Sequence, residues 1–265
     1  MTNLYEEFEF LRDEHNSIII LGLDPKNDVE RKKVIELSKI EEGLIGFKPN
    51  LKFYQDKGGR ERLIKISENI APTMIKILDL KSSDGWGSNK PEIIEYAPHY
   101  NYFTIAPAGG CIEETIEGAI GLERETISMG AMSFPGVLRE ATSGFPLFVE
   151  RVDRAIETGT SAFVLGATAY VPESAFENVM RKYRNLGSDK AITEKEFSDE
   201  KLELALRSRN SLFKYIVGKM KENPQLLALV PGFGRQGGNL EYFLESGIDL
   251  NRCMINAGSD ILKAE

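Results

Sequence analysis

The chain of 265 residues has a net charge of −8, which argues against nucleic acid or an anionic membrane surface as its main partner, because both bind basic protein faces. Its length suits one α/β barrel, a fold that commonly needs about 250 residues, and its 42% apolar and 28% charged residues are ordinary for a globular protein. No stretch approaches the roughly 20 apolar residues of a membrane span, and the acidic N-terminal segment lacks the features of a signal peptide, so we expect a cytoplasmic protein.

The cysteines and histidines are few and scattered. Cys111 and Cys253 are far apart in the sequence, so we expect free thiols in a reducing compartment. His15 and His99 are the only histidines, and neither has a partner at the spacing of metal ligands. We therefore expect no metal site.

Eight short apolar runs recur along the chain, and most are followed by a segment of helical periodicity. The runs are 17–24, 43–49, 73–81, 102–107, 125–133, 161–167, 226–232 and 252–258. The helical segments are 28–40, 51–69, 90–98, 111–121, 144–159, 173–184 and 238–247, with a further one at 3–14 that we expect to cover part of the barrel. Such runs are typical of parallel strands buried on both faces, and eight of them predict a (β/α)8 TIM barrel. An open doubly wound sheet is the alternative, which the absence of GxGxxG after the first run disfavours.

The segment 171–222 interrupts this regularity, because it is too long for one connecting helix. We interpret it as a helical insertion within a single domain that spans 1–265. A substrate lid is a second interpretation, since long loops are often lids.

Charged residues follow the first three predicted strands. Asp24 ends the first strand and Lys48 the second, while Asp79, Lys81 and Asp84 follow one another at the end of the third. Working groups of barrel enzymes lie at these carboxyl ends. Residues two apart on a strand share a face, so the sequence predicts a mixed cluster that holds a lysine protonated and aimed for proton transfer. A network that only ties strands together is the alternative.

Glycine-bearing segments follow the last two strands. PGFGRQGG (231–238) leads into a helix, and NAGSD (256–260) closes the eighth strand. The loops after the seventh and eighth strands form the usual phosphate site of this fold, and glycine lets the backbone approach a phosphate closely. Tight turns alone would also favour glycine.

Six motifs in this order resemble orotidine 5′-phosphate decarboxylase, and more closely its longer bacterial-type branch. They are GLDP (22–25), GFKPN (46–50), DLKSSD (79–84), MSFPG (132–136), VLGATA (164–169) and PGFGRQGG (231–238). The resemblance implies decarboxylation of orotidine 5′-monophosphate to uridine 5′-monophosphate, the last step of de novo pyrimidine synthesis, without any cofactor.

The resemblance also implies catalytic roles. Lys81 would donate a proton to C6 of the pyrimidine, and Asp79 would lie near the substrate carboxylate. Lys48 and Asp84 would complete the alternating charges, with Asp84 reaching the neighbouring subunit's site, so a homodimer with shared active sites is implied. Asp24 would bind the ribose hydroxyls.

Five further positions would bind the nucleotide according to the same resemblance. Ser133 would hydrogen-bond the pyrimidine, and Ser88 would contact the nucleotide of the partner subunit. Gln236 would reach the phosphate, together with backbone N–H groups near Gly258 and Ser259.

One departure and two alternatives accompany this interpretation. Ser259 occupies the place of the family's phosphate-binding arginine, and we hypothesise that Arg235 supplies the missing charge. Mg²⁺-dependent sugar-phosphate enzymes, the hexulose-6-phosphate synthases and keto-gulonate-phosphate decarboxylases, share DxKxxD but place an acid where Lys48 stands. A non-catalytic nucleotide-binding barrel is the second alternative.

Overall fold

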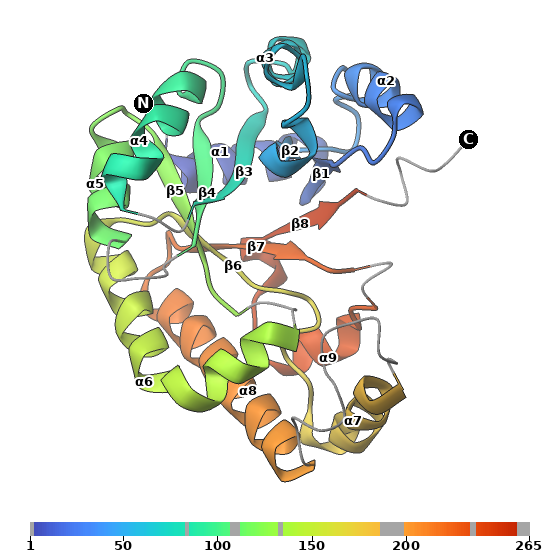
Figure 1. Ribbon diagram of the computed structural model, residues 1–265, viewed down its shortest axis with the longest axis vertical. Coiled ribbons are helices and arrows are strands. Elements are labelled where there is room, and N and C mark those ends of the chain that lie inside the picture. The colour runs from blue at the N-terminus through green and yellow to red at the C-terminus, as the bar shows by residue number, and fades with distance from the viewer. Residues whose placement is uncertain are drawn as a thin grey trace.

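The computed structural model describes residues 3–82, 85–106, 112–131, 135–185, 199–233 and 237–258. Eight parallel strands close into a barrel in which each strand pairs with the next and the eighth returns to the first. The strands are β1 (Ile19–Leu23), β2 (Gly46–Pro49), β3 (Ile75–Ser82), β4 (Tyr102–Ile105), β5 (Glu125–Met129), β6 (Ala162–Val164), β7 (Leu227–Pro231) and β8 (Cys253–Ala257). The predicted (β/α)8 TIM barrel is thereby confirmed (Figure 1).

Helices connect the strands and surround them. They are α1 (Leu4–His15), α2 (Asp28–Leu37), α3 (Gly59–Asn69), α4 (Trp86–Tyr96), α5 (Ile112–Ile120), α6 (Pro135–Thr158), α7 (Phe176–Asn185), α8 (Asp199–Glu222) and α9 (Leu240–Glu245), with short 3-10 turns η1 (Leu51–Tyr54), η2 (Glu173–Ala175) and η3 (Leu250–Arg252). Within the described ranges, none of the helices combines the length and the apolar character needed to cross a bilayer.

Two helices differ from their predicted ranges for identifiable reasons. The segment 51–69 forms η1 and then α3, because Gly58 adopts a left-handed φ of 80° and a Cβ on the next residue would lie 1.7 Å from the Tyr54 carbonyl oxygen. We expected the helix before the sixth strand to begin at residue 144, but it begins at Pro135, whose fixed φ suits the first helical position.

The barrel interior is filled by one apolar cluster that every strand region supplies. Ile20, Ile77, Ile127, Leu229 and Met254 are among its members, all at most 1% exposed. Two further clusters lie between the strands and the surrounding helices, one beneath α2, α3 and α4 and the other beneath α5, α6, α8 and α9. These layers hold the strand ends in fixed positions.

Helix α1 belongs to the interior cluster rather than to the outer ring. Its Leu4, Phe8 and Leu11 are fully buried together with the strand residues. The Leu4 N–H donates to both carboxylate oxygens of Glu125, at 3.2 and 3.3 Å, and the Tyr102 hydroxyl donates to Glu7. The helix therefore closes the end of the barrel at which the strands begin. The sequence analysis expected a helix at 3–14 that covers part of the barrel, and α1 does so.

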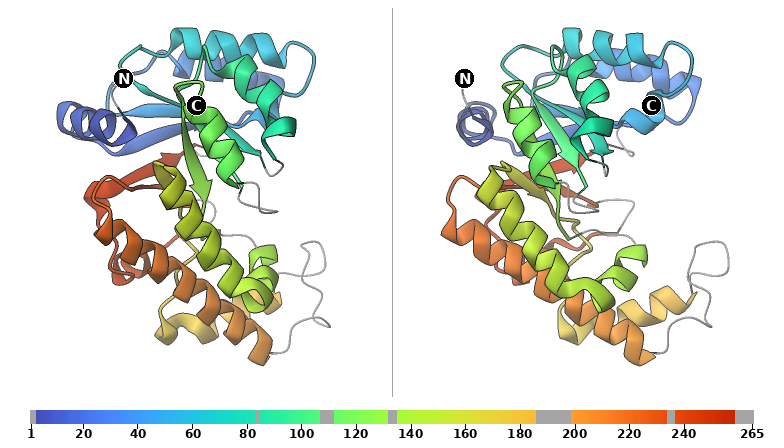
Figure 2. Two further views of the ribbon diagram at one scale, coloured as in Figure 1. Left: turned by 90° about the vertical axis from the view of Figure 1, so that its left-hand side faces the viewer. Right: turned by 60° about the vertical axis from the view of Figure 1, so that its left-hand side comes forward.

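Helices α7 and α8 occupy much of the segment 171–222. Helix α8 lies along α6 and leads into β7, which is the position of a barrel helix (Figure 2). Phe176 of α7 packs in a small apolar cluster with Leu202 and Leu206 of α8, and the Val171 N–H donates to the Asn210 side chain at 3.0 Å. Both helices are thus anchored to the barrel, and the interpretation of the segment as an insertion or a lid stays a prediction.

Candidate active site

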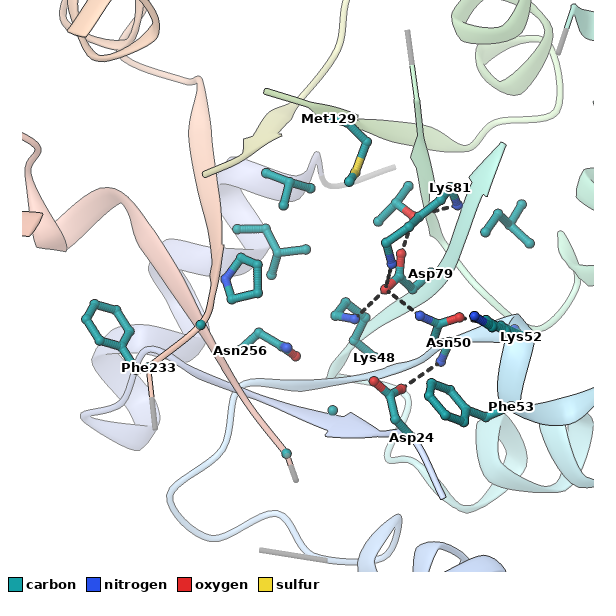
Figure 3. A pocket seen from close by; sticks show the side chains of 18 of the residues that line it. Asp24, Lys48, Asn50, Lys52, Phe53, Asp79, Lys81, Met129, Phe233 and Asn256 are labelled. Atoms are coloured by element: carbon teal, nitrogen blue, oxygen red, sulfur yellow. Dashed lines mark hydrogen bonds and ion pairs between the residues drawn. The ribbon is translucent and has the colours of Figure 1, made fainter. Parts of the chain in front are cut away.

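A cavity of about 500 Å³ opens at the carboxyl ends of the strands (Figure 3). Its volume lies within the usual range for small-molecule sites. The charged residues that line it in the described part of the chain are Asp24, Lys26, Lys48, Lys52, Asp79 and Lys81. Four lysines against two aspartates leave a local charge of +2 inside a chain whose net charge is −8. The cavity is therefore suited to an anionic ligand.

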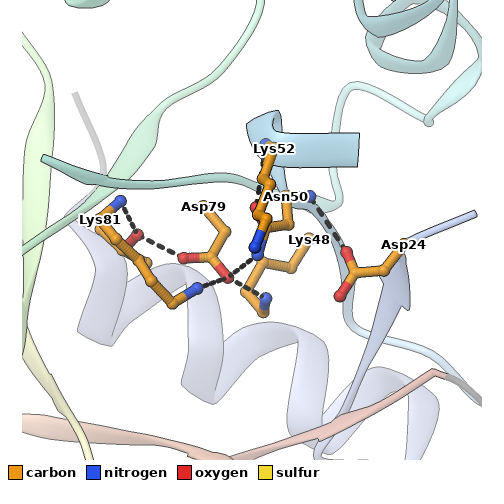
Figure 4. A network of polar contacts seen from close by, with 7 residues as sticks. Asp24, Lys48, Asn50, Lys52, Asp79 and Lys81 are labelled. Atoms are coloured by element: carbon orange, nitrogen blue, oxygen red, sulfur yellow. Dashed lines mark hydrogen bonds and ion pairs between the residues drawn. The ribbon is translucent and has the colours of Figure 1, made fainter. Parts of the chain in front are cut away.

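Asp79 is the centre of the polar network in this cavity (Figure 4). Its Oδ2 accepts from Lys48 Nζ at 2.7 Å, from Lys81 Nζ at 2.5 Å and from Asn50 Nδ2 at 3.3 Å. Asp79 and Lys48 are only 4% and 5% exposed, whereas the Lys81 side chain is 35% exposed. One buried carboxylate thus holds two ammonium groups, and the more exposed of the two faces the ligand space.

Thr104 of β4 orients both Asp79 and Lys81. Its hydroxyl donates to Asp79 Oδ1 at 2.6 Å, and its Oγ1 accepts from the backbone N–H of Lys81 at 3.1 Å. Thr104 is 1% exposed, so these bonds are made away from solvent. The second carboxylate oxygen of Asp79 is therefore fixed independently of the lysines.

Lys81 has an unusual backbone conformation. Its φ is 52°, in the left-handed region that non-glycine residues rarely adopt. The pairing of β3 with β4 is irregular between Leu78 and Ser82, so Lys81 lies in a bulge of the strand. Bulges re-aim side chains near active sites, and strain of this kind is concentrated at functional positions. The predicted proximity of Asp79 and Lys81 is confirmed, although a bulge rather than regular strand alternation sets the direction of Lys81.

The surroundings shift the pKa values of these groups in different directions. Burial alone would raise the pKa of Asp79, but the charges of Lys48 and Lys81 outweigh it and hold the pKa well below its usual range. Burial lowers the pKa of Lys81, and Asp79 offsets only part of that effect. Burial also acts to lower the pKa of Lys48, but Asp79 and Asp24 raise it above the ordinary lysine value. Lys81 is thus the stronger acid of the two lysines.

Asp24 lies beside this network and is linked to it through Asn50. The Asn50 backbone N–H donates to Asp24 Oδ1 at 3.1 Å, while the Asn50 side chain donates to Asp79. Burial raises the pKa of Asp24, and nearby Lys48 reduces the rise. Asp24 lines the cavity, and among the described residues its other carboxylate oxygen has no hydrogen-bond partner (Figure 4), so this oxygen can accept from a ligand hydroxyl.

The structure brings together four predicted site residues, namely Asp24, Lys48, Asp79 and Lys81. Gly258 also lines the cavity, at the end of β8. Ser88 is exposed on α4 and does not line it. The remaining predicted positions lie outside the described residues: Asp84, Ser133, Arg235, Gln236 and Ser259.

Several cavity residues were not predicted from the sequence. Asn50 directly follows FKP, and its position at the end of a predicted strand could have marked it as a cavity residue. Thr104 lies within the fourth apolar run, where the prediction considered only the uncharged end of the strand. Lys26 and Lys52 follow the first and second strands in short connections, where a lysine is ordinarily solvated.

No group of three or more histidine, cysteine, aspartate or glutamate side chains with metal-binding geometry occurs among the described residues. In the cavity, each of the two aspartates lies beside lysine. The expectation of a metal-free site stays a prediction.

The sequence matches no protein-family model and no curated protein. Solved structures do match. Leishmania donovani UMP synthase aligns with all of this chain at 18% identity and a TM-score of 0.66, and 53% of that protein is covered, so this chain spans about half its length. Leishmania donovani OMP decarboxylase aligns over 98% of this chain and 91% of its own, at 18% identity and a TM-score of 0.64. Plasmodium berghei orotidine 5′-monophosphate decarboxylase aligns over 99% and 93%, at 14% identity and a TM-score of 0.64.

This barrel is similar in fold to orotidine 5′-monophosphate decarboxylases. Three motifs that carry the resemblance to that family lie at the ends of neighbouring strands: GLDP at the end of β1, GFKPN along β2 and DLKSSD from the end of β3. They supply Asp24, Lys48, Asp79 and Lys81, the residues that meet in the cavity.

Proposed function

We propose that the chain decarboxylates orotidine 5′-monophosphate to uridine 5′-monophosphate, with Lys81 as proton donor and without a cofactor. The observation that carries this proposal is the Lys48–Asp79–Lys81 network, in which a lysine of lowered pKa faces the cavity beside a buried, ionised carboxylate. The fold shared with the decarboxylases supports it.

The proposed reaction breaks the bond between C6 and the carboxyl group, and the electron pair stays on C6 as carbon dioxide leaves. A fixed ammonium beside C6 stabilises that negative charge where it develops. Lys81 then transfers a proton to C6, which its lowered pKa favours, and remains as a neutral amine until it is reprotonated. Lys81 thus supplies both the stabilising charge and the proton.

Asp79 would face the substrate carboxylate in this arrangement. Its depressed pKa keeps it ionised at neutral pH, so it would disfavour a second carboxylate nearby, an effect that is relieved when carbon dioxide leaves. Lys48 and Thr104 hold Asp79 in place, which keeps the charges in fixed order. Asp24 would accept hydrogen bonds from the ribose hydroxyls.

The remaining roles of the proposal rest on the resemblance. Ser133 would bind the pyrimidine, and Gln236 with the backbone near Gly258 and Ser259 would bind the phosphate. Arg235 would supply charge in place of the family's arginine. If so, replacing Arg235 with alanine weakens binding of the nucleotide, and an unchanged affinity counts against that role.

We also propose that the single barrel domain works as a homodimer, with Asp84 and Ser88 contributing to the partner's site, in the cytoplasm. Ser88 is exposed on α4, which leaves it accessible to a second subunit. Analytical ultracentrifugation tests the assembly. Complementation between Asp84→Ala and Lys81→Ala chains, each inactive alone, tests whether active sites are shared.

The decisive experiment follows the loss of orotate absorbance with purified protein and orotidine 5′-monophosphate in EDTA. We expect turnover in EDTA that disappears in Lys81→Ala and persists in Lys32→Ala, which removes an exposed lysine of α2 outside the cavity. Turnover of sugar phosphates that requires Mg²⁺ would instead support the Mg²⁺-dependent enzymes. Tight binding of uridine 5′-monophosphate without turnover would support a non-catalytic barrel.

A further inference from the structure

The cavity contains two lysines whose charge is not used by the Asp79 network. Lys48 and Lys81 both bind Asp79. Lys26 and Lys52 also line the cavity, and in the described part of the chain no carboxylate lies within ion-pair distance of either ammonium group. As far as the described residues show, two positive charges therefore remain for an anionic ligand.

The last two strands supply no cation of their own to the described cavity wall. Phe233 after β7 and Asn256 and Gly258 at the end of β8 line the cavity, and none is charged (Figure 3). In barrels of this kind the loops after the seventh and eighth strands commonly bind a phosphate. The described residues of these two strands offer such a phosphate dianion no positive side chain, so a neighbouring strand is the available source of a further countercharge.

Lys26 is placed to provide it, because β1 is the direct neighbour of β8 in the closed barrel. Leu21 pairs with Ala257 across these two strands. Their ends approach so closely that a Cβ on Gly258 would lie 2.8 Å from the carbonyl oxygen of Gly22. Lys26 follows β1 in the short connection to α2 and lines the same cavity as Gly258 at the end of β8. Lys52 follows β2 and is separated from β8 by β1.

The backbone of this connection is also held in place. The Lys26 N–H donates to Glu30 Oε2 at 2.8 Å, and the Asn27 side chain caps α2 by accepting from the Glu30 N–H at 2.9 Å. The lysine side chain therefore extends from an anchored segment, while its ammonium has no carboxylate partner in the described ranges.

We infer that Lys26 is a cationic contact for the phosphate group of the ligand on the β1 side of the cavity, in addition to the charge proposed for Arg235. This rests on the proposed function, since it assigns the phosphomonoester of that nucleotide to this side of the cavity. Lysine binds phosphate through a single mobile ammonium group, whereas arginine donates two parallel hydrogen bonds from its guanidinium group. The contact selects for the phosphorylated ligand and leaves the base and ribose contacts untouched.

The test compares binding of uridine 5′-monophosphate and uridine by calorimetry. Lys26→Met keeps the aliphatic stem and removes the charge. We expect it to weaken binding of the nucleotide about 10-fold or more, the lower range for a charge-assisted hydrogen bond, and to leave uridine affinity unchanged. Lys26→Arg should retain most of the preference for the nucleotide. The matched control Lys32→Met makes the same change of net charge on exposed α2 and should bind both ligands as the wild type does.

Two results overturn the inference. One is an unchanged ratio of nucleotide to nucleoside affinity in Lys26→Met. The other is an equal loss in Lys52→Met, which would indicate a diffuse field rather than a local contact. Wild-type turnover measured in parallel separates the two proposals. If the wild type is active and Lys26→Met binds the nucleotide as the wild type does, only the role of Lys26 is refuted. If the wild type neither turns over orotidine 5′-monophosphate nor binds uridine 5′-monophosphate, both proposals are refuted.

Discussion

Replacing Asp79 with alanine should lower the free energy of unfolding by about 3–5 kcal/mol at neutral pH, because it leaves buried charges without their partner. Lys48 is 5% exposed and loses its 2.7 Å ion pair, and Lys81 and Thr104 lose their bonds to the same carboxylate. For a domain of this size, about 3–5 kcal/mol corresponds to a decrease in Tm of roughly 6–20 °C.

The assay is urea and thermal unfolding followed by circular dichroism in buffer at pH 7. Asp79→Asn keeps the size and one acceptor oxygen, so it should fall between the wild type and Asp79→Ala. The control is Asp13→Ala, which breaks the ion pair with Arg12 at a side chain that is 73% exposed and should change the free energy of unfolding by at most about 1 kcal/mol. The reasoning is refuted if Asp79→Ala is as stable as Asp13→Ala, since that would mean that the lysines are not held by Asp79.

Three further predictions follow from the same geometry. The rate constant kcat/KM should fall as the pH rises through the pKa of Lys81, because the proton donor is then lost. Since that pKa is lowered, the decline should begin below the ordinary lysine value of 10.5, and a decline centred above 10.5 would contradict this assignment. Replacing Thr104 with valine removes the hydrogen bond to Asp79 and should lower kcat together with the free energy of unfolding, the latter by about 1–3 kcal/mol, as measured by stopped-flow absorbance and urea unfolding; unaltered values of both would show that Asp79 needs no such support. Replacing Gly118 with alanine places a Cβ 2.3 Å from the Trp86 ring, so we expect about 1–3 kcal/mol of destabilisation and a shifted emission spectrum of this single tryptophan, whereas an identical spectrum would mean that the ring does not pack there.

The strand pattern was predictable because strands buried on both faces are short apolar runs, and all eight observed strands lie within the predicted ones or extend them by a residue. Helix starts were less predictable, since they depend on local backbone conformations. The left-handed φ of Gly58 splits one predicted helix, and the turn that admits it is a tertiary feature. Proline is ordinarily tolerated only in the first turn of a helix, and the predicted helix 144–159 begins two residues before Pro146, whereas the observed α6 begins at Pro135 and continues through Pro146.

The candidate site was predictable to the extent that its residues are charged and stand at strand ends. Asp24, Lys48, Asp79 and Lys81 satisfy both conditions and meet in the cavity. Thr104 satisfies neither, because it is neutral and lies inside a strand. It reaches Asp79 because β3 and β4 are neighbouring strands, in which Leu78 pairs with Phe103. Which lysines are paired with a carboxylate also depends on distances between strands, which a sequence pattern does not contain.

Helix α1 imposes an order on the assembly of this barrel during translation. It is synthesised before all eight strands, yet its Leu4, Phe8 and Leu11 are buried in a cluster that includes Met254 of the eighth strand. At ordinary rates of synthesis the complete docking surface exists only roughly 10–50 s after α1 itself has been made. Until then the apolar face of α1 has no complete surface to pack against, and a chain arrested before β8 keeps that face exposed. Helix α1 therefore reaches its final packing only when β8, the last strand of the barrel, has been synthesised.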